Sequence, residues 1–157
     1  LFSPAATFSV IVSLLFKMLL DDVSEVRTTV FPAVVSLLNR LSKEEDVDWC
    51  EQLATRIIEQ LVPSAGYQQR LSYVKICRHI INAEDSAKVQ QGVFRKHMLP
   101  ILLSLSGDSV ANVRVAVADT LKSAPSWLLE GGSGISTLGT LRNDGDRDVA
   151  FAAAASK

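Results

Sequence analysis

The sequence predicts an all-α fold, an αα-superhelix of about three and a half stacked helix pairs, from an internal repeat and from its helical periodicity. The repeat reads Asp21-Asp22-Val23-Ser24-Glu25-Val26-Arg27, returns as Asp108-Ser109-Val110-Ala111-Asn112-Val113-Arg114, and returns more weakly at 144–150. A degenerate copy fits between the first two if Ser64 and Arg70 take the aspartate and arginine positions. The aspartate positions are then separated by 43, 44 and 36 residues, a period typical of two-helix solenoid repeats.

The domain organisation follows from the same repeat. The chain has 157 residues, of which 48% are hydrophobic, and no stretch alternates apolar and polar residues over strand length. We expect one array, and we expect it to be a piece of a longer chain because it begins at Leu1 without methionine and stops inside a predicted helix. The predicted repeats cover approximately 5–42, 46–82, 86–124 and 126–157.

Repeat one is predicted to hold helices over 5–20 and 23–42. The second of these carries an apolar stripe on one helical face, made of Val26, Val30, Val34, Leu37 and Leu41. Pro32 lies inside it, so we expect a kink near Val30 or a helix that restarts there.

Repeat two follows the acidic cluster at 44–46, which favours a helix N-terminus. Its first helix carries Trp49, Leu53, Ile57 and Leu61, and its second runs over 67–82 with Leu71, Val74, Cys77 and Ile81 inward. Cys50 and Cys77 fall inside these apolar patterns, so we interpret both as core residues, and two cysteines without a disulfide framework suit a reducing compartment.

Repeat three is expected to start near Ser86, to bend at Pro100, and to end at Pro125 after a helix with Val110, Val113, Val117 and Leu121 inward. Repeat four is weaker. Glycines at 131, 132 and 134 are expected to loosen its first helix, and the segment 146–155 is rich in alanine.

The repeated residues have a physical reason. An aspartate just before a helix accepts bonds from free amides, and the two valines of each copy are expected to close the turn against the paired helix. The arginine six residues after the aspartate, Arg27 or Arg114, is positioned to reach the acidic turn of a neighbouring repeat. We therefore predict a ladder of ion pairs along one ridge, interrupted where Ser64 and Ala150 occupy the key positions.

Composition argues against several function classes. The net charge is −1, which gives no basic footprint for nucleic acid and no reason to expect binding to an anionic membrane. No nucleophile and base occur together, and His79 and His97 have no partner at metal-ligand spacing, so we expect neither an enzyme nor a cofactor. The trio Asp144, Asp146 and Asp148 lacks the glycine and glutamate of a calcium loop and reads as a helix start.

A resemblance narrows the function. The segment Lys96-His97-Met98-Leu99-Pro100, followed by 107–114, resembles HEAT repeats and in particular the scaffold (A) subunit of protein phosphatase 2A. Tyr67-Gln68-Gln69-Arg70-Leu71 and the segment 22–27 extend the resemblance over most of 15–125. Related scaffolds of other serine/threonine phosphatases, such as regulatory subunits of phosphatase 4, look much the same.

The resemblance implies a non-catalytic scaffold, cytoplasmic and also nuclear, that holds a phosphatase catalytic subunit and a further regulatory subunit through the turns between paired helices. The implied contacts are Tyr67, Arg70 and Leu71 in repeat two, Asn112 in repeat three, and Val23 and Ser24 in repeat one, although the family tends to have an aromatic residue at the place of Ser24. Tyrosine and arginine suit this role because they dominate many interfaces.

Two alternatives stay open at this point. One is a transport or cargo solenoid that recognises a peptide through its concave helices. The other is a tubulin-binding array, although such arrays place tryptophan and basic residues in their turns, whereas Trp49 and Trp127 lie at the starts of predicted first helices.

Overall fold

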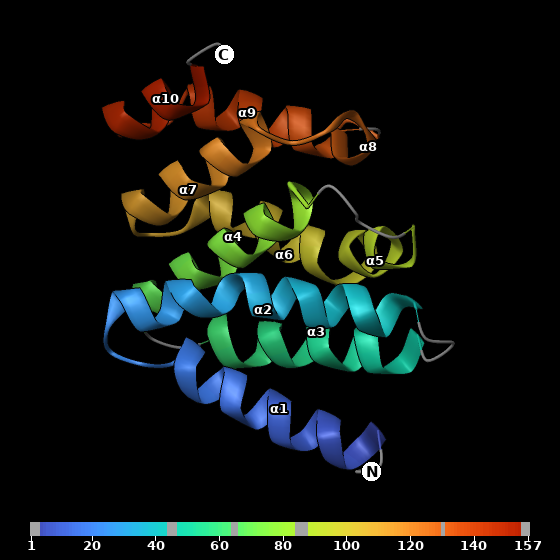
Figure 1. Ribbon diagram of the computed structural model, residues 1–157. Helices are drawn as coiled ribbons and strands as arrows, with labels where there is room; N and C mark the ends of the chain where they lie inside the picture. The colour runs from blue at the N-terminus through green and yellow to red at the C-terminus, as the bar shows by residue number, and fades with distance from the viewer. Residues whose placement is uncertain (1–3, 44–46, 64–65, 84–87, 130, 155–157) are drawn as a thin grey trace.

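The computed structural model describes residues 4–43, 47–63, 66–83, 88–129 and 131–154. Every regular element in these ranges is helical, which confirms the predicted all-α class. The helices pile up from the N-terminal to the C-terminal end of the chain (Figure 1). Within the same ranges, no helix combines the length and apolarity needed to cross a membrane.

The helices fall into pairs. Repeat one holds α1 (Pro4–Leu19) and α2 (Ser24–Lys43), and repeat two holds α3 (Val47–Leu61) and α4 (Tyr67–Ile81). In repeat three a broken first helix precedes α7 (Ala111–Lys122). Its parts are α5 (Lys88–Val93), a π-helix (Phe94–Met98), α6 (Leu99–Ser104) and a 3-10 turn (Leu105–Gly107). Repeat four holds α8 (Ser126–Leu129), α9 (Ser133–Arg142) and α10 (Arg147–Ala154).

Successive pairs stack in register. The second helices α2, α4, α7 and α10 contact one another in chain order, while α3 contacts α5 and the π-helix, and α6 contacts α9. In Figure 1, α2, α4 and α7 all begin at the left edge of the stack, so their N-terminal turns follow one another along that edge. The chain is therefore a helical-repeat solenoid with two layers of helices.

The core lies between these layers. Most of the predicted apolar stripes are buried there, whereas Val26, Leu37, Trp49, Leu71 and Val110 are only partly buried. Cys50 and Cys77 are fully buried, as predicted, and burial raises the pKa of the Cys77 thiol to about 12. Its thiolate is therefore scarce at neutral pH, and the residue acts as a small apolar side chain.

Both tryptophans pack against the first helix of the preceding repeat. The rings of Phe8 and Trp49 lie 4.4 Å apart, and those of Phe94 and Trp127 lie 6.2 Å apart in an edge-to-face arrangement. Arg95 also lies over the Trp127 ring and donates to its backbone oxygen. The same aromatic contact thus joins repeats one and two and repeats three and four.

The two interior prolines behave differently. The helix α2 runs unbroken through Pro32, so the predicted restart near Val30 is wrong. Pro32 is exposed and its neighbours Phe31 and Val34 are buried, so core packing holds the helix across the missing hydrogen bond. At Pro100 the predicted irregularity is present as the π-helix, in which the Leu99 amide donates to the Phe94 oxygen five residues earlier.

The glycines of repeat four act as predicted. Gly131 and Gly132 have φ angles of +99° and +80°, a left-handed conformation that side chains disfavour. They separate α8 from α9, so the first helix of this repeat is split in two.

The Tyr73 hydroxyl offers a test of the contact between repeats two and three. Tyr73 is fully buried and donates to the Met98 oxygen of the π-helix at 2.8 Å. Tyr73→Phe should lower the free energy of unfolding by about 1 kcal/mol because it removes this buried hydrogen bond. Urea unfolding followed by circular dichroism measures the loss. Tyr67→Phe, at an exposed tyrosine, is the matched control, and an equal loss in both variants would contradict the assignment.

Candidate protein-interaction ridge

The turns between paired helices form a ridge along one edge of the stack. We define this turn ridge by Asp21–Val23, by the start of α4 at Tyr67, by Asp108–Asn112, and by Asn143–Asp146. Because the repeats stack in register, each turn follows the one before it. Of the six residues that the sequence singled out for partner contact, Val23, Tyr67 and Asn112 belong to the ridge, and Ser24, Arg70 and Leu71 lie at the starts of α2 and α4 beside it.

The repeated aspartates build identical turns. In each turn, one carboxylate oxygen of the aspartate accepts a hydrogen bond from the backbone amide two residues later in the chain. The amides of Val23, Val110 and Asp146 donate in this way to Asp21, Asp108 and Asp144, each at 2.8 Å. The sequence predicted that these aspartates cap the first turn of the helix. The amides they bind belong to residues that precede the helices, so the aspartates instead order the turns between paired helices.

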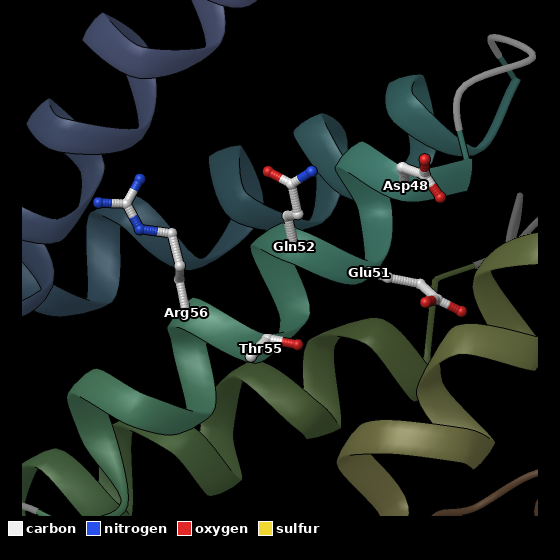
Figure 2. A pocket seen from close by; sticks show the side chains of 5 residues that line it. All are labelled: Asp48, Glu51, Gln52, Thr55 and Arg56. Carbon is white, nitrogen blue, oxygen red and sulfur yellow. The ribbon is translucent and has the colours of Figure 1, made fainter.

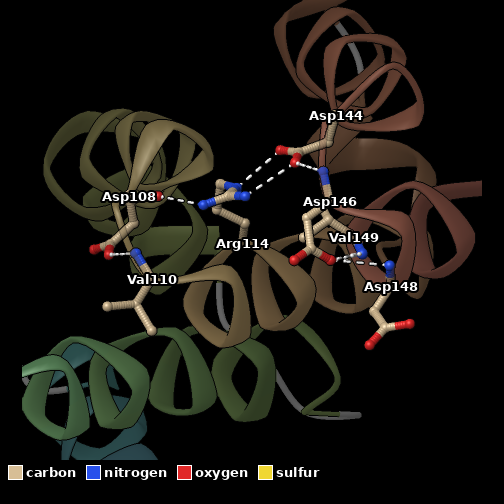
Figure 3. A network of polar contacts seen from close by, with 7 residues as sticks. All are labelled: Asp108, Val110, Arg114, Asp144, Asp146, Asp148 and Val149. Atoms are coloured by element: carbon tan, nitrogen blue, oxygen red, sulfur yellow. Dashed lines mark hydrogen bonds and ion pairs between the residues drawn. The ribbon is translucent and has the colours of Figure 1, made fainter.

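Asp146 is the N-cap residue of α10. It belongs to the trio Asp144, Asp146 and Asp148, which the sequence analysis compared with a calcium loop. Asp146 accepts the amides of Asp148 and Val149 at 2.9 and 3.3 Å, and Figure 3 shows its carboxylate turned toward them. The prediction of a helix start is confirmed. Across the part of the chain that the structure describes, no three acidic, histidine or cysteine side chains are arranged to hold a metal ion.

The predicted ladder of ion pairs is confirmed for Arg114 but not for Arg27, and Arg70, which the sequence had singled out for partner contact, makes a second step. Arg70 of repeat two donates to both carboxylate oxygens of Asp108 in repeat three, at 2.5 and 3.0 Å. Arg114 of repeat three donates to both oxygens of Asp144 in repeat four, at 2.8 and 2.9 Å, and to the backbone oxygen of Asp108 at 2.7 Å (Figure 3). Both arginines therefore connect their own repeat to the turn of the next repeat, and Arg114 also bonds the backbone of its own turn.

Arg27 is placed differently. It is buried and donates to the backbone oxygens of Asp21 and Asp22 in its own turn, at 2.6 and 2.9 Å. In the next repeat, the aspartate position of the pattern is occupied by Ser64, which lies outside the described residues. Its contact with Asp21 matches that of Arg114 with Asp108, so the arginine also organises the turn that precedes its helix.

The ladder pairs are largely shielded from solvent. The side chains of Arg70 and Asp108 are 16% and 4% exposed. The hydrogen bond from Arg70 holds the pKa of Asp108 below its ordinary value of 3.8, and the bond from Arg114 does the same for Asp144. The two carboxylates in turn raise the pKa values of the two arginines. Bidentate pairs of this kind are strong and directional, so they set the spacing of adjacent turns.

The six predicted contact residues differ in accessibility. Val23 is 51% exposed and Tyr67 is 41% exposed, and Ser24 and Asn112 are also exposed. Arg70 is committed to Asp108, and Leu71 packs against the core. The exposed residues of this set are therefore Val23, Ser24, Tyr67 and Asn112, whereas Arg70 is largely buried in its ion pair with Asp108.

Two shallow hollows lie away from the ridge. One, of about 350 Å³, has a described lining from α3 alone: Asp48, Glu51, Gln52, Thr55 and Arg56 (Figure 2). Glu51 accepts a bond from Lys96 of the π-helix at 2.9 Å, which lowers its pKa. The sequence did not predict this contact between Glu51 of α3 and Lys96 of the π-helix, because nothing in the repeat pattern relates the two residues.

The second hollow, of about 460 Å³, lies between α2 and α4. Pro32, Val35 and Ser36 line it from α2, and Arg78, His79, Asn82 and Ala83 line it from the end of α4. The His79 ring lies 5.8 Å from the ring of Phe31.

Comparison with known proteins agrees with the family resemblance. No family model matches the chain. Over 122 residues the chain is 27% identical to serine/threonine-protein phosphatase 4 regulatory subunit 1 of Rattus norvegicus, Homo sapiens and Mus musculus. The match covers 78% of the chain but 12% of each relative, so the chain spans about an eighth of their length. The similarity is thus to a phosphatase regulatory subunit and is weak.

Asp108→Asn tests the ladder. Asparagine keeps an oxygen for the Val110 amide but leaves the largely buried Arg70 without its counter-charge, so unfolding should cost about 1–3 kcal/mol less at pH 7. The pKa of Asp108 is lower in the folded state than its ordinary value of 3.8. Its contribution to the stability of the folded protein is therefore fully present at pH values above 3.8, and it is lost as the pH falls through the folded-state pKa.

The measurement is urea unfolding of both proteins at pH 7 and at pH 3. The difference between the native protein and Asp108→Asn should shrink at the acid pH. Asp148→Asn is the control, because the exposed Asp148 carboxylate points away from the network in Figure 3. A difference that is independent of pH would rule out the ion pair as its source.

Proposed function

We propose that this chain is part of a non-catalytic HEAT-type scaffold that binds a serine/threonine phosphatase catalytic subunit through the turn ridge. The observation that carries the proposal is the similarity to a phosphatase 4 regulatory subunit over 78% of the chain. The resemblance of the repeated turns to phosphatase scaffolds agrees with it. A further regulatory subunit is a second partner in this proposal, and the location is the cytoplasm, with the nucleus in addition.

The physical properties of the ridge suit this role. Bidentate ion pairs hold the turns of repeats two, three and four at fixed spacing, so binding through Tyr67 and Asn112 requires little ordering of the scaffold. Tyr67 offers a large amphipathic surface with few rotatable bonds, and Val23 offers an apolar contact in the adjacent repeat. A partner that spans several turns could contact both at once.

Tyr67→Ala combined with Asn112→Ala tests the proposed interface. Both residues are exposed, so the double variant should keep its helical circular dichroism. It should bind a purified phosphatase 4 catalytic subunit at least about tenfold more weakly, measured by surface-based interferometry, because truncation of a central aromatic contact typically costs more than 1 kcal/mol.

Arg70 is left intact in that variant because its loss would disturb the ladder. Ile135→Ala is the matched control, since Ile135 is an exposed apolar residue on α9, away from the ridge. Undiminished binding by the double variant, or an equal loss in Ile135→Ala, would remove the turn ridge as the interface.

The hollow between α2 and α4 favours a second candidate function, the capture of an acidic peptide by the second-helix layer. Arg78 and His79 line the hollow, and Lys75 lies one turn earlier on the same exposed face of α4. The described lining of the hollow includes no carboxylate. Pro32, Val35 and Ala83 supply apolar surface beside these groups. Charge and shape together fit an acidic segment with an apolar side chain.

Arg78→Glu tests this second candidate. The variant should bind a fluorescein-labelled acidic peptide at least about tenfold more weakly in low salt, because it replaces attraction by repulsion at the hollow. Lys17→Glu, on the exposed face of α1, makes the same change in net charge and should leave the anisotropy titration unchanged. Equal effects of the two variants would mean that net charge alone attracts the peptide.

A further inference from the structure

The exposed face of α4 carries a row of hydrogen-bond donors. Lys75, Arg78, His79 and Asn82 are all exposed, and their spacing puts them on one side of the helix. We call these four residues the donor row, which is about 10 Å long at the usual rise of an α-helix. Its last three members line the hollow between α2 and α4, and Lys75 lies one turn earlier.

The positive charge of the donor row has no counter-charge beside it. The sequence of α4 contains no acidic residue, and no ion pair among the described residues involves Lys75 or Arg78. The single acidic residue of α2 is Glu25 in its first turn, and that of α7 is Asp119, which lies beside a lysine of its own helix. Like charges at this spacing repel each other, so the row costs stability while it is unoccupied.

Helix capping does not account for the donor row. Basic side chains in the last turn of a helix often bind its free carbonyl groups. Here backbone amides serve that purpose, because the Asn82 amide donates to the Arg78 oxygen at 3.1 Å and the Ala83 amide to the Ile80 oxygen at 3.3 Å. Among the described contacts, neither Arg78 nor His79 donates from its side chain to these carbonyl groups.

The α2 side of the hollow is mainly apolar. Pro32 and Val35 line it, together with the small residue Ser36. The His79 ring lies 5.8 Å from the ring of the buried Phe31, so the core positions the imidazole at the hollow. A ligand in the hollow therefore meets donors from α4 and an apolar surface from α2.

A phosphoryl group matches these donors better than a carboxylate does. A carboxylate has one charge and two oxygens, whereas a phosphorylated side chain carries about −1.5 to −2 charges at neutral pH and three acceptor oxygens. Arg78 can donate two parallel bonds to such a group, and His79 and Asn82 offer further donors in the same hollow. One phosphoryl group thus satisfies donors that would otherwise need two separate carboxylates.

We infer that the hollow between α2 and α4 binds a phosphorylated peptide segment. Its phosphoryl group accepts hydrogen bonds from Arg78 and its neighbours in the donor row, and an adjacent apolar side chain packs on Pro32 and Val35. This inference rests on the second candidate function and names its ligand. It is independent of a phosphatase partner at the turn ridge.

The hollow and the turn ridge lie at opposite ends of α4. Tyr67 begins the helix at the ridge, and Arg78 follows it by about 16 Å along the helix axis. Both sites are therefore open to occupation at the same time. A scaffold of this kind would hold a phosphorylated protein on the same array as the partner of its ridge.

Matched peptides test the phosphoryl group. One short fluorescein-labelled peptide is made with phosphoserine, glutamate or serine beside a leucine, with neutral residues elsewhere, and each form is titrated against the 157-residue chain by anisotropy. The phosphoserine form should bind at least about tenfold more tightly than the glutamate form, because its larger charge and third oxygen engage more donors. The serine form should bind most weakly.

Arg78→Gln tests the site. It should weaken binding of the phosphoserine form at least about tenfold, and Arg78→Lys, which keeps the charge but loses the paired N–H donors, should bind with intermediate affinity. Arg147→Gln, at an exposed arginine of α10, makes the same change in net charge away from the hollow and should leave the titration unchanged. All three variants should keep their helical circular dichroism, because both arginines are exposed.

The opposite results overturn the inference. Equal binding of the glutamate and phosphoserine forms would leave the capture of acidic peptides intact and remove the phosphoryl group as the ligand, whereas no binding of either form would remove both. Equal losses in Arg78→Gln and Arg147→Gln would mean that net charge alone attracts the peptide. Displacement of the phosphoserine form by an equal concentration of inorganic phosphate would mean that the free anion is the ligand and the peptide is not.

Discussion

The structure depends on the stacking of apolar faces between successive helix pairs. A single pair has apolar side chains on two sides, and each becomes buried only when another pair lies against it. Phe31, Tyr73, Phe94 and Leu102 are almost fully buried in this way, and the largest part of the stability arises there. Because stacking is non-directional, it does not by itself set how far one pair slides along the next.

The ion pairs of the turn ridge supply that missing direction. A bidentate contact between guanidinium and carboxylate has a narrow geometry, so Arg70 and Arg114 fix the turn of one repeat relative to the next. The fixed turns then carry the exposed residues that form the proposed interface. The same constraint links stability to the proposed interface, because Arg70 lies one helical turn after Tyr67 and is itself largely buried in its ion pair.

The two ends of the stack are not equivalent. At the N-terminal end, Asp21 accepts the Val23 amide and the apolar Val10, Ile11 and Leu14 of α1 are exposed, whereas at the C-terminal end Ala150 stands at the position of the repeated arginine. The exposed Phe151 and Ile135 show that the last repeat also leaves apolar surface uncovered.

The sequence by itself determined the helical class, the repeat period, the inward stripes and the arginine ladder, because these depend on regular spacing and on the pairing of opposite charges. Only the tertiary structure decided that α2 continues through Pro32, that the aspartates order turns before the helices, and that Arg70 is committed to Asp108. The reason is physical: packing across repeats can outweigh a local helix breaker, and the availability of a charged side chain depends on a partner about forty residues away in the chain.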